Sequence, residues 1–302
     1  MTDTAVSIRN TVKVYANGFK ALDNVSFEVK QGEFFALLGH NGAGKTTLIS
    51  AMAGLVELTQ GEISVCGFDV KQSPFAVRRN LGVVPQELVF DPFFTVREAL
   101  KFQSGYFGIA HNDDWIDEIL HHLGLTDKAK VNSRNLSGGM KRRLMVALAL
   151  VHKPPVIVLD EPTAGVDVEL RQSLWAFIRR LNSEGHTVIL TTHYLEEAQT
   201  LCNRIAMMKN GKLVALDDTE KLLHDDNGIT VAFKVFRLPE ILEKNKIDNK
   251  NGDFILHFDD YNQLTNALNL LNKEQIHIEN MQILETDLES VFVRLMNEEK
   301  EN

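Results

Sequence analysis

Residues 39–47 read GHNGAGKTT, which matches the phosphate-binding loop pattern G-x-x-x-x-G-K-[ST]. An apolar run precedes this stretch and a helical pattern follows it, as such a loop requires. Glycines let backbone N–H groups turn towards phosphate oxygens, and the following helix adds the positive end of its dipole. We expect Lys45 to reach the β- and γ-phosphates of a nucleotide and the Thr46 hydroxyl to bind Mg²⁺. The expected phosphate-binding residues are Gly39, His40, Asn41, Gly42, Ala43, Gly44, Lys45, Thr46 and Thr47.

The chain around this loop indicates a layered α/β core. Short continuous apolar runs suit strands that are buried on both faces of a parallel sheet. Helical patterns lie between these runs, and such alternation is typical of α/β layers. In chain order the runs and helices fall at 34–38, 45–53, 140–153, 156–159, 169–181 and 188–190. Near the N-terminus, 12–14 and 25–29 alternate apolar with polar residues, as half-buried strands do.

The same patterns predict two domains. Residues 1–217 form the α/β domain, and about 87–152 form a helical subdomain inserted into it, because this span has helical stretches at 95–105 and 113–123 and no strong strand signal. Asn210-Gly211 between two apolar runs predicts a hairpin that closes the domain. Residues 218–302 then alternate strand and helix patterns, and they predict a small C-terminal α+β domain.

Composition limits the classes of function. The 302 residues are 44% hydrophobic and 24% charged, as in ordinary globular proteins. The longest apolar run, 144–151, is less than half of the roughly 18 residues that a membrane span needs. The N-terminus lacks the pattern of a secretory signal, and two cysteines suit a reducing cytoplasm. We therefore expect any membrane role to come through a partner.

Charge is concentrated in the C-terminal part. Residues 218–302 carry 18 acidic and 9 basic side chains, which accounts for the whole net charge of −9. Nucleic-acid binding depends on neutralising phosphates with basic side chains. We therefore expect no nucleic-acid partner.

Two adjacent carboxylates follow the apolar run at 156–159. Asp160 would hold a hydrated Mg²⁺, a hard cation that prefers oxygen ligands. Glu161 points elsewhere and would polarise the attacking water as general base. A solvated strand end is the usual interpretation of such a pair, but the phosphate-binding loop upstream favours the catalytic one.

A second glycine-rich segment lies at 136–140, LSGGM. Ser137 would cap the helix that follows, and its exposed N-terminus would form a second anion site. One γ-phosphate cannot contact two distant sites of one chain, but it can lie between two chains related head to tail by a two-fold axis. A helix cap with no ligand is an equally good interpretation of this segment alone. The residues concerned are Ser137, Gly138 and Gly139.

Taken in order, these motifs resemble the nucleotide-binding domain of ABC transporters. The resemblance covers about 10–215 and implies that domain's fold, a mixed sheet with an inserted helical subdomain and an N-terminal antiparallel β region. It also implies the cofactors ATP and Mg²⁺. LSGGMKRRL at 136–144, TAGVD at 163–167 and THYLEEA at 192–198 are similar to the type-2 exporter branch for drugs, antibiotics and polysaccharides, and within it to YadG-type ATPases.

The resemblance also assigns roles that no residue pattern gives alone. It implies that Tyr15 stacks on adenine, and that Gln86 binds Mg²⁺ and couples to a membrane subunit. Asp167 would reach the partner protomer, and His193 would sense the γ-phosphate, so that Lys45, Gln86, Glu161 and His193 form the catalytic set. His40 departs from the family, which usually has proline there, and adds a titratable group near the phosphates.

The expected function is therefore the ATP-hydrolysing subunit of a membrane exporter. Its partners would be a second copy of itself and a separate permease, which would hold it at the cytoplasmic face of the inner or plasma membrane. A soluble ABC ATPase of ribosomes or DNA is the alternative, but such proteins carry two cassettes or a coiled-coil insertion, and neither is present. The transported substrate is not encoded, because the permease contacts it. Apolar residues between 86 and 95 (Leu88, Val89, Phe90, Phe93 and Phe94) would form either the permease-docking surface or a local core plug.

Overall fold

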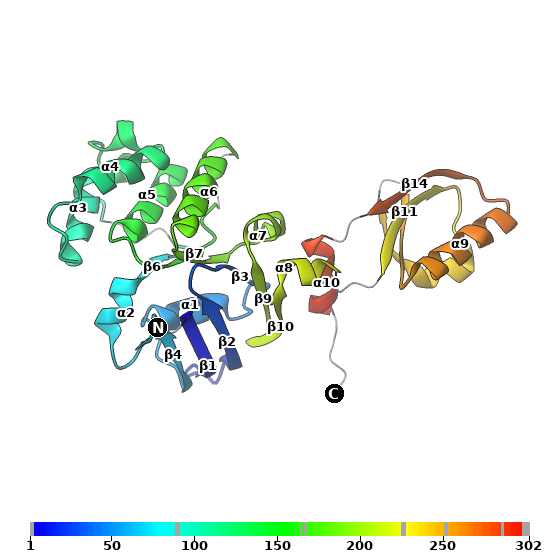
Figure 1. Cartoon of the computed structure of the whole chain (residues 1–302), viewed down its shortest axis with the longest axis horizontal. Helices are drawn as coiled ribbons and strands as arrows, with labels where there is room; N and C mark the ends of the chain where they lie inside the picture. The colour runs from blue at the N-terminus through cyan, green and yellow to red at the C-terminus, as the bar shows by residue number, and fades with distance from the viewer. Residues whose placement is uncertain are drawn as a thin grey trace. The chain divides into compact units, whose positions relative to one another are not determined.

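The structure is a computed structural model that describes residues 3–87, 91–163, 165, 168–224, 228–250, 253–284 and 287–297. The chain divides into two units, Met1–Asp217 and Asp218–Asn302 (Figure 1). In the described part of the chain, no helix is long and apolar enough to cross a membrane.

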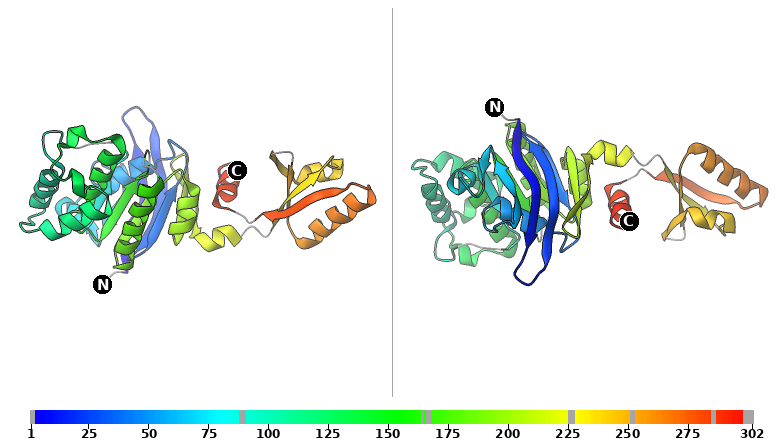
Figure 2. Two further views of the ribbon diagram at one scale, coloured as in Figure 1. Left: turned by 90° about the horizontal axis from the view of Figure 1, so that it is seen from above. Right: turned by 90° about the horizontal axis from the view of Figure 1, so that it is seen from below.

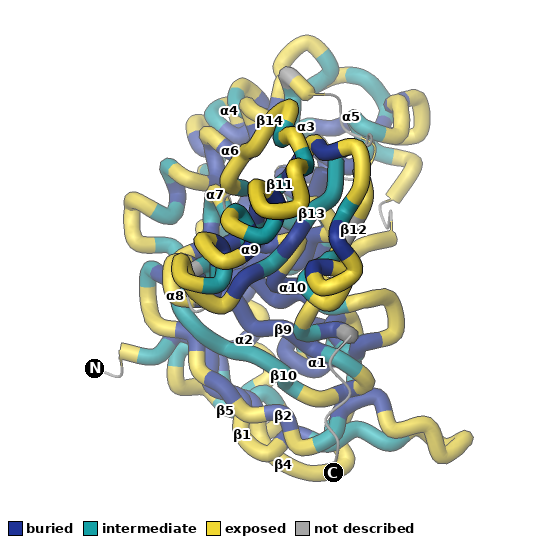
Figure 3. Tube along the Cα trace, turned by 90° about the vertical axis from the view of Figure 1, so that its right-hand side faces the viewer, coloured by how far each residue is buried: buried dark blue, intermediate teal, exposed yellow. Residues whose placement is uncertain are grey.

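The first unit is built on a six-stranded sheet of order β10-β9-β3-β8-β7-β6. Its strands are β3 (Phe34–Leu38), β6 (Leu81–Val84), β7 (Val156–Asp160), β8 (Thr187–Thr191), β9 (Arg204–Lys209) and β10 (Lys212–Asp218). The four pairs from β9 to β6 are parallel, and every residue of β3, β7 and β8 is buried. The edge strand β10 is mostly half-buried beside the buried β9 (Figure 3). Because parallel strands end at one edge of a sheet, the segments that follow β3, β6, β7 and β8 come together there.

A second, antiparallel sheet of order β2-β1-β4-β5 lies in the same unit. It consists of β1 (Thr4–Val14), β2 (Lys20–Lys30), β4 (Gln60–Val65) and β5 (Phe68–Asp69), and the long pair β1 and β2 is visible in blue in Figure 2. The helix α1 (Lys45–Met52) buries Leu48 and Met52 in one core with residues of both sheets. The helix that follows the phosphate-binding loop is thereby fixed by packing.

Helices form the remainder of the first unit. They are α2 (Pro74–Asn80), α3 (Val96–Tyr106), α4 (Asp113–His122), α5 (Gly138–Leu150), α6 (Val168–Ser183) and α7 (Leu195–Leu201), with short 3-10 turns η1 (Thr126–Lys128) and η2 (Ser133–Asn135). Thr95 and Glu98 form a capping box at the start of α3, in which their side-chain oxygens accept from backbone N–H groups that a helix start otherwise leaves unpaired. The helices α3, α4 and α5 contact one another and lie together in Figure 1. Trp115 of α4 donates to the carbonyl of Leu150 of α5 at 3.0 Å.

The second unit contains an antiparallel sheet of order β12-β13-β11-β14. Its elements are α8 (Thr219–His224), β11 (Ile229–Val235), η3 (Glu240–Asn245), β12 (Lys246–Lys250), β13 (Asp253–Phe258), α9 (Tyr261–Lys273), β14 (Ile278–Leu284) and α10 (Leu288–Asn297). Leu264, Ala267 and Leu271 of α9 share a core with Phe233 of β11 and Phe258 of β13.

The last helix, α10, carries the apolar stripe that the sequence predicts. The sequence places Val291, Phe292 and Leu295 on one stripe, which could contact either a second copy or the domain itself. Val291 and Phe292 are buried, and α10 contacts α8. Two of the three stripe residues are therefore buried, and α8 of the same unit lies beside this helix.

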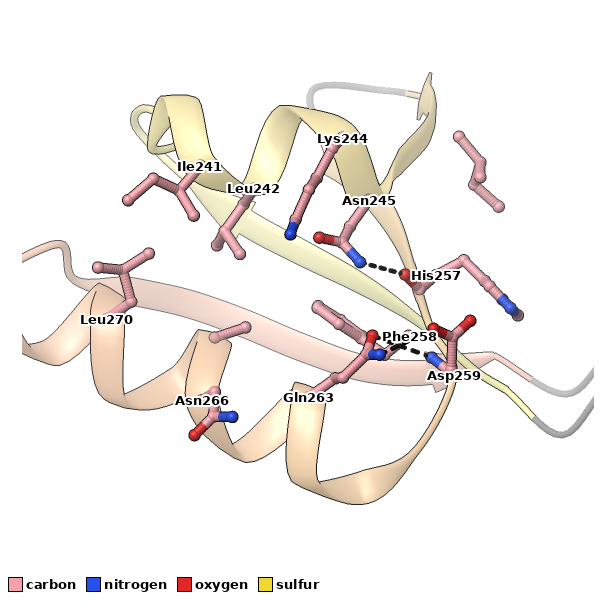
Figure 4. A pocket seen from close by; sticks show the side chains of 12 residues that line it. Ile241, Leu242, Lys244, Asn245, His257, Phe258, Asp259, Gln263, Asn266 and Leu270 are labelled. Atoms are coloured by element: carbon pink, nitrogen blue, oxygen red, sulfur yellow. Dashed lines mark hydrogen bonds between the residues drawn. The ribbon is translucent and has the colours of Figure 1, made fainter.

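A pocket of about 560 Å³ opens in the second unit among η3, the end of β13 and α9 (Figure 4). Asn245 donates to the carbonyl of His257 at 2.9 Å, and Gln263 donates to a carboxylate oxygen of Asp259 at 2.7 Å. These polar side chains join the segments that wall the pocket.

Candidate active site

The loop between β3 and α1 requires glycine at two positions. Gly39 has φ 153° and Gly44 has φ 105°, a range that side chains disfavour. A Cβ at Gly39 would lie 2.4 Å from the carbonyl oxygen of Met208, and one at Gly44 would lie 2.5 Å from that of Ala21. The loop therefore passes too close to neighbouring backbone for any other residue.

A pocket of about 340 Å³ opens beside this loop. Its lining residues come from the turn between β1 and β2, the start of β2, the phosphate-binding loop, the start of α1, the segment after β6, and the end of β7 with the residue that follows it. They are Phe19, Ala21, Asn41, Gly42, Ala43, Gly44, Lys45, Thr46, Thr47, Gln86, Asp160 and Glu161. Most of the residues expected to hold phosphate and metal thus line one cavity.

Lys45 is folded back onto the loop. Its Nζ donates to the carbonyls of Gly39 at 2.6 Å and His40 at 3.1 Å. Burial lowers the pKa of Lys45 below its ordinary value, and the nearby charges of Asp160 and Glu161 act in the opposite direction. Phosphate oxygens would add negative charge to this site and favour the ammonium form.

Asp160 is almost fully buried at the end of β7, with 3% of its surface exposed. The Thr191 hydroxyl donates to its Oδ1. Burial raises the pKa of the Asp160 carboxyl, while the Thr191 hydrogen bond and the charge of Lys45 oppose that rise. This carboxylate has a fixed orientation, as a metal ligand needs.

Glu161 lies at the centre of a polar cluster. Gln86, after β6, donates from Nε2 to Glu161 Oε2 at 3.3 Å. His193, after β8, places Nδ1 3.7 Å from Glu161 Oε1. The ends of three parallel strands therefore bring together Gln86, Glu161 and His193, which are separated in the sequence.

Tyr15 and His40 lie at the edges of this arrangement. Tyr15 is 38% exposed, and its hydroxyl lies 3.5 Å from the Thr47 hydroxyl. Lys13 Nζ lies 5.0 Å from the centre of the Tyr15 ring. His40 is exposed, and neither residue lines the described pocket.

The segment at 137–139 forms the start of α5. Ser137 caps the helix, because its hydroxyl accepts from the Met140 N–H at 3.3 Å. Ser137 and Gly138 are exposed, whereas Gly139 is half-buried. In the part of the chain that the structure describes, none of the three lines the pocket of Lys45. Asp167 lies outside the described residues.

Comparison with known proteins identifies the family. The profile described as ABC transporter matches residues 22–164. Linearmycin resistance ATP-binding protein LnrL of Bacillus subtilis (strain 168) is 39% identical over 209 residues, which are 68% of this chain and 67% of that protein. Nod factor export ATP-binding protein I of Burkholderia thailandensis is 43% identical over 212 residues, 70% of each chain. The chain belongs to the ABC transporter family. It is an ATP-binding subunit and an ATPase, and the resemblance found in the sequence is confirmed.

A solved structure supports the fold of this ABC ATPase. A dimeric ATP-binding cassette, in a post-hydrolysis state bound to ADP and Pi, superposes with a TM-score of 0.66 at 27% identity. The match covers 71% of this chain and 98% of the other. The expected fold class, an ABC nucleotide-binding domain with a mixed sheet, helices and an N-terminal antiparallel sheet, is confirmed.

Three residues of this ABC ATPase's site escaped sequence reasoning. Phe19 lines the pocket beside the loop. Thr191 holds Asp160 and also accepts from the Glu161 N–H. Arg142 is buried in α5 and donates to the carbonyls of both Asp160 and Glu161. Of the three, only Arg142 could have been noticed in the sequence, because three basic residues at 141–143 precede the apolar run of this helix.

Proposed function

We propose that this ABC ATPase energises export through a separate membrane permease, and that its pocket at 39–47 hydrolyses MgATP between two copies of the chain. The observation that carries the proposal is the polar cluster of Gln86, Glu161 and His193 at the phosphate loop. Glu161 is the general base of the proposed reaction. Its side chain is 17% exposed, so water can reach it.

The nucleotide would be held by the loop and α1. Backbone N–H groups of 39–47 and the Lys45 ammonium bind the phosphates in this proposal, and Tyr15 stacks on adenine. The exposed ring of Tyr15 beside Thr47 supports that role. His193 would contact the γ-phosphate, and its Nδ1 lies 3.7 Å from Glu161 Oε1, so that it would link the nucleotide to the base.

The donor set fits Mg²⁺. Thr46, Gln86 and Asp160 line the same pocket and offer hydroxyl, amide and carboxylate oxygens, the ligand types that this hard cation prefers. Mg²⁺ usually keeps several waters and binds one or two protein carboxylates together with substrate phosphates. When bound, Mg²⁺ would neutralise phosphate charge. Asp160 holds its carboxylate in place through Thr191.

A second copy completes the site in this proposal. Ser137 and Gly138 are exposed at the capped start of α5, and they do not line their own chain's pocket. In a head-to-tail pair they would face the partner's γ-phosphate, and Asp167 would cross to the partner. The dimeric cassette that this chain superposes on supports such a pair.

The proposals of a permease partner and of a membrane location are based on the relatives of this chain. The name of one relative, Nod factor export ATP-binding protein I, describes an export component. We therefore place this subunit at the cytoplasmic face of the membrane, held there by a permease, with the first unit as catalyst and the second as an accessory domain.

The proposal is tested with Glu161→Gln. Removing a general base costs a factor of about 10²–10⁴ in turnover, while ATP binding should persist. Sedimentation with MgATP should then show a stable dimer that the unmodified chain forms only transiently. Turnover at the unmodified rate would exclude Glu161 as the base.

A further inference from the structure

Arg142 is a buried cation that joins α5 to the ends of two strands. It is 4% exposed. Its Nη1 donates to the carbonyls of Pro85 and Gln86, and its Nη2 donates to those of Asp160 and Glu161, with 2.9 Å to Gln86 and 2.7 Å to Glu161. All four acceptors are backbone oxygens that lie just after β6, at the end of β7 or just after β7. One guanidinium therefore fixes the two segments that supply Gln86 and Glu161.

The backbone of Glu161 needs such support. Its φ is 51°, in the left-handed region that residues other than glycine rarely occupy. Conformations of this kind persist only where the surroundings impose them. The Glu161 N–H donates to the carbonyl oxygen of Thr191 at 3.1 Å and to its hydroxyl at 3.2 Å, and Arg142 holds the Glu161 carbonyl. The peptide groups on both sides of the residue are thus fixed by hydrogen bonds.

The chemistry of this contact is specific to arginine. The guanidinium presents five N–H donors in a rigid plane, whereas lysine presents one compact ammonium. Burial lowers the pKa of Arg142, although the charges of Asp160 and Glu161 oppose that effect. The guanidinium still stays charged, because arginine is not deprotonated in proteins.

We propose that Arg142 is a positioning residue that holds the Glu161 and Gln86 backbones in the geometry for hydrolysis. It lies one turn into α5, whose capped start at Ser137 would contact the partner's nucleotide. Arg142 therefore links the residues that bind the partner's ATP to the catalytic carboxylate of its own chain. This inference rests on the proposed role of Glu161 as general base.

The test compares Arg142→Lys and Arg142→Gln with a control that also weakens α5. Trp115→Phe removes the hydrogen bond to Leu150 at the other end of the same helix and leaves the strand ends untouched. Misplacing a reacting group by about 1 Å can cost up to about 100-fold in rate. We expect both Arg142 variants to lower kcat about 10- to 100-fold with the Kd for MgATP nearly unchanged, and Trp115→Phe to lower Tm without changing kcat.

A double-mutant cycle shows whether Arg142 acts through Glu161. In single-turnover measurements, Arg142→Lys should add no further loss to Glu161→Gln, and the double variant should still form the MgATP dimer. An unchanged kcat in folded Arg142→Lys and Arg142→Gln would overturn the inference, and so would losses that multiply in the double variant. If neither variant folds, Arg142 is a structural residue and the inference is likewise overturned. Full turnover in Glu161→Gln alone would instead refute the proposed function.

Discussion

Neighbouring carboxylates have different environments at the end of β7. Asp160 is buried and accepts from Thr191, whereas Glu161 is partly exposed and contacts Gln86 and His193. The sequence predicts that the two side chains point apart, because successive residues of a strand face opposite sides. It does not predict the positive φ of Glu161, which depends on Thr191 and Arg142 from distant segments. The sequence therefore predicts which side chains carry the chemistry. It does not predict the hydrogen bonds from distant segments that hold the Glu161 backbone in place.

Asp160→Asn is expected to stabilise the nucleotide-free protein. Burial raises the pKa of Asp160 in the folded state above its ordinary value of 3.8, so the ionised carboxylate opposes folding at neutral pH. The amide keeps an oxygen for the Thr191 hydroxyl and carries no charge. We expect the free energy of unfolding at pH 7 to rise by about 1 kcal/mol, as at other functional sites that sacrifice stability. Chemical denaturation without nucleotide or metal measures it.

The pH dependence of the gain in stability from Asp160→Asn distinguishes the removal of a buried charge from a change in packing. Because the pKa of Asp160 is higher in the folded state than in the unfolded state, the ionised carboxylate lowers the free energy of unfolding at any pH above the folded-state pKa. This loss of stability disappears below pH 3.8, where the carboxyl is protonated in both states. The gain from Asp160→Asn should therefore shrink as pH falls. Asp127→Asn, at an exposed site, serves as control. A loss of stability at pH 7 in Asp160→Asn would contradict the account.

Elements with strong apolar signals were predicted well. The runs at 34–38, 156–159 and 188–190 are strands β3, β7 and β8, because a strand buried on both faces leaves an unbroken apolar run. The helix expected from 140 begins at Gly138, since Ser137 caps it two residues earlier. The sequence did not predict the strand β12, KIDNK, because these residues have no apolar strand pattern. They form a strand by pairing with β13. The helix α2 was missed as well.

The segment before α3 supplies a prediction about the permease. Leu88, Val89 and Phe90 lie outside the described residues, but Phe93 is 80% exposed. Phe94 instead packs on Phe102 with ring centres 4.4 Å apart. Exposed apolar clusters often mark partner surfaces. We expect Phe93→Asp to leave the ATPase activity of the free subunit unchanged and to reduce co-purification with the permease.

The control for docking is another exposed aromatic residue. Phe236→Asp changes a side chain that is 97% exposed in the second unit, and it should leave co-purification intact. A fall in Tm or loss of folding in Phe93→Asp would show that Phe93 supports the local core instead. Equal loss of co-purification in both variants would mean that added charge, and not this surface, weakens the complex.

At the scale of the molecule, the chemistry and the charge lie in different units. Every described residue of the phosphate pocket lies before Asp217, whereas the net charge of −9 comes from 218–302. The second unit has its own core around Phe233 and Phe258. The sequence indicated this division by its change of pattern and charge. It could not show that Val291 and Phe292 of α10 are buried, because an apolar stripe does not specify what covers it.

A chain that ends at Asp218, the last residue of β10, is expected to keep the ATPase activity. It retains all six strands of the parallel-rich sheet and all the described lining of the phosphate pocket. Turnover per site should stay within about twofold, since surface changes remote from the chemistry remove no transition-state contact. Lys45→Ala in the shortened chain is the control, because activity that survives it would come from a contaminant. Circular dichroism verifies folding. A folded shortened chain that neither binds nor hydrolyses MgATP would show that residues 219–302 contribute to the active site. The assignment of catalysis to the first unit alone would then be wrong.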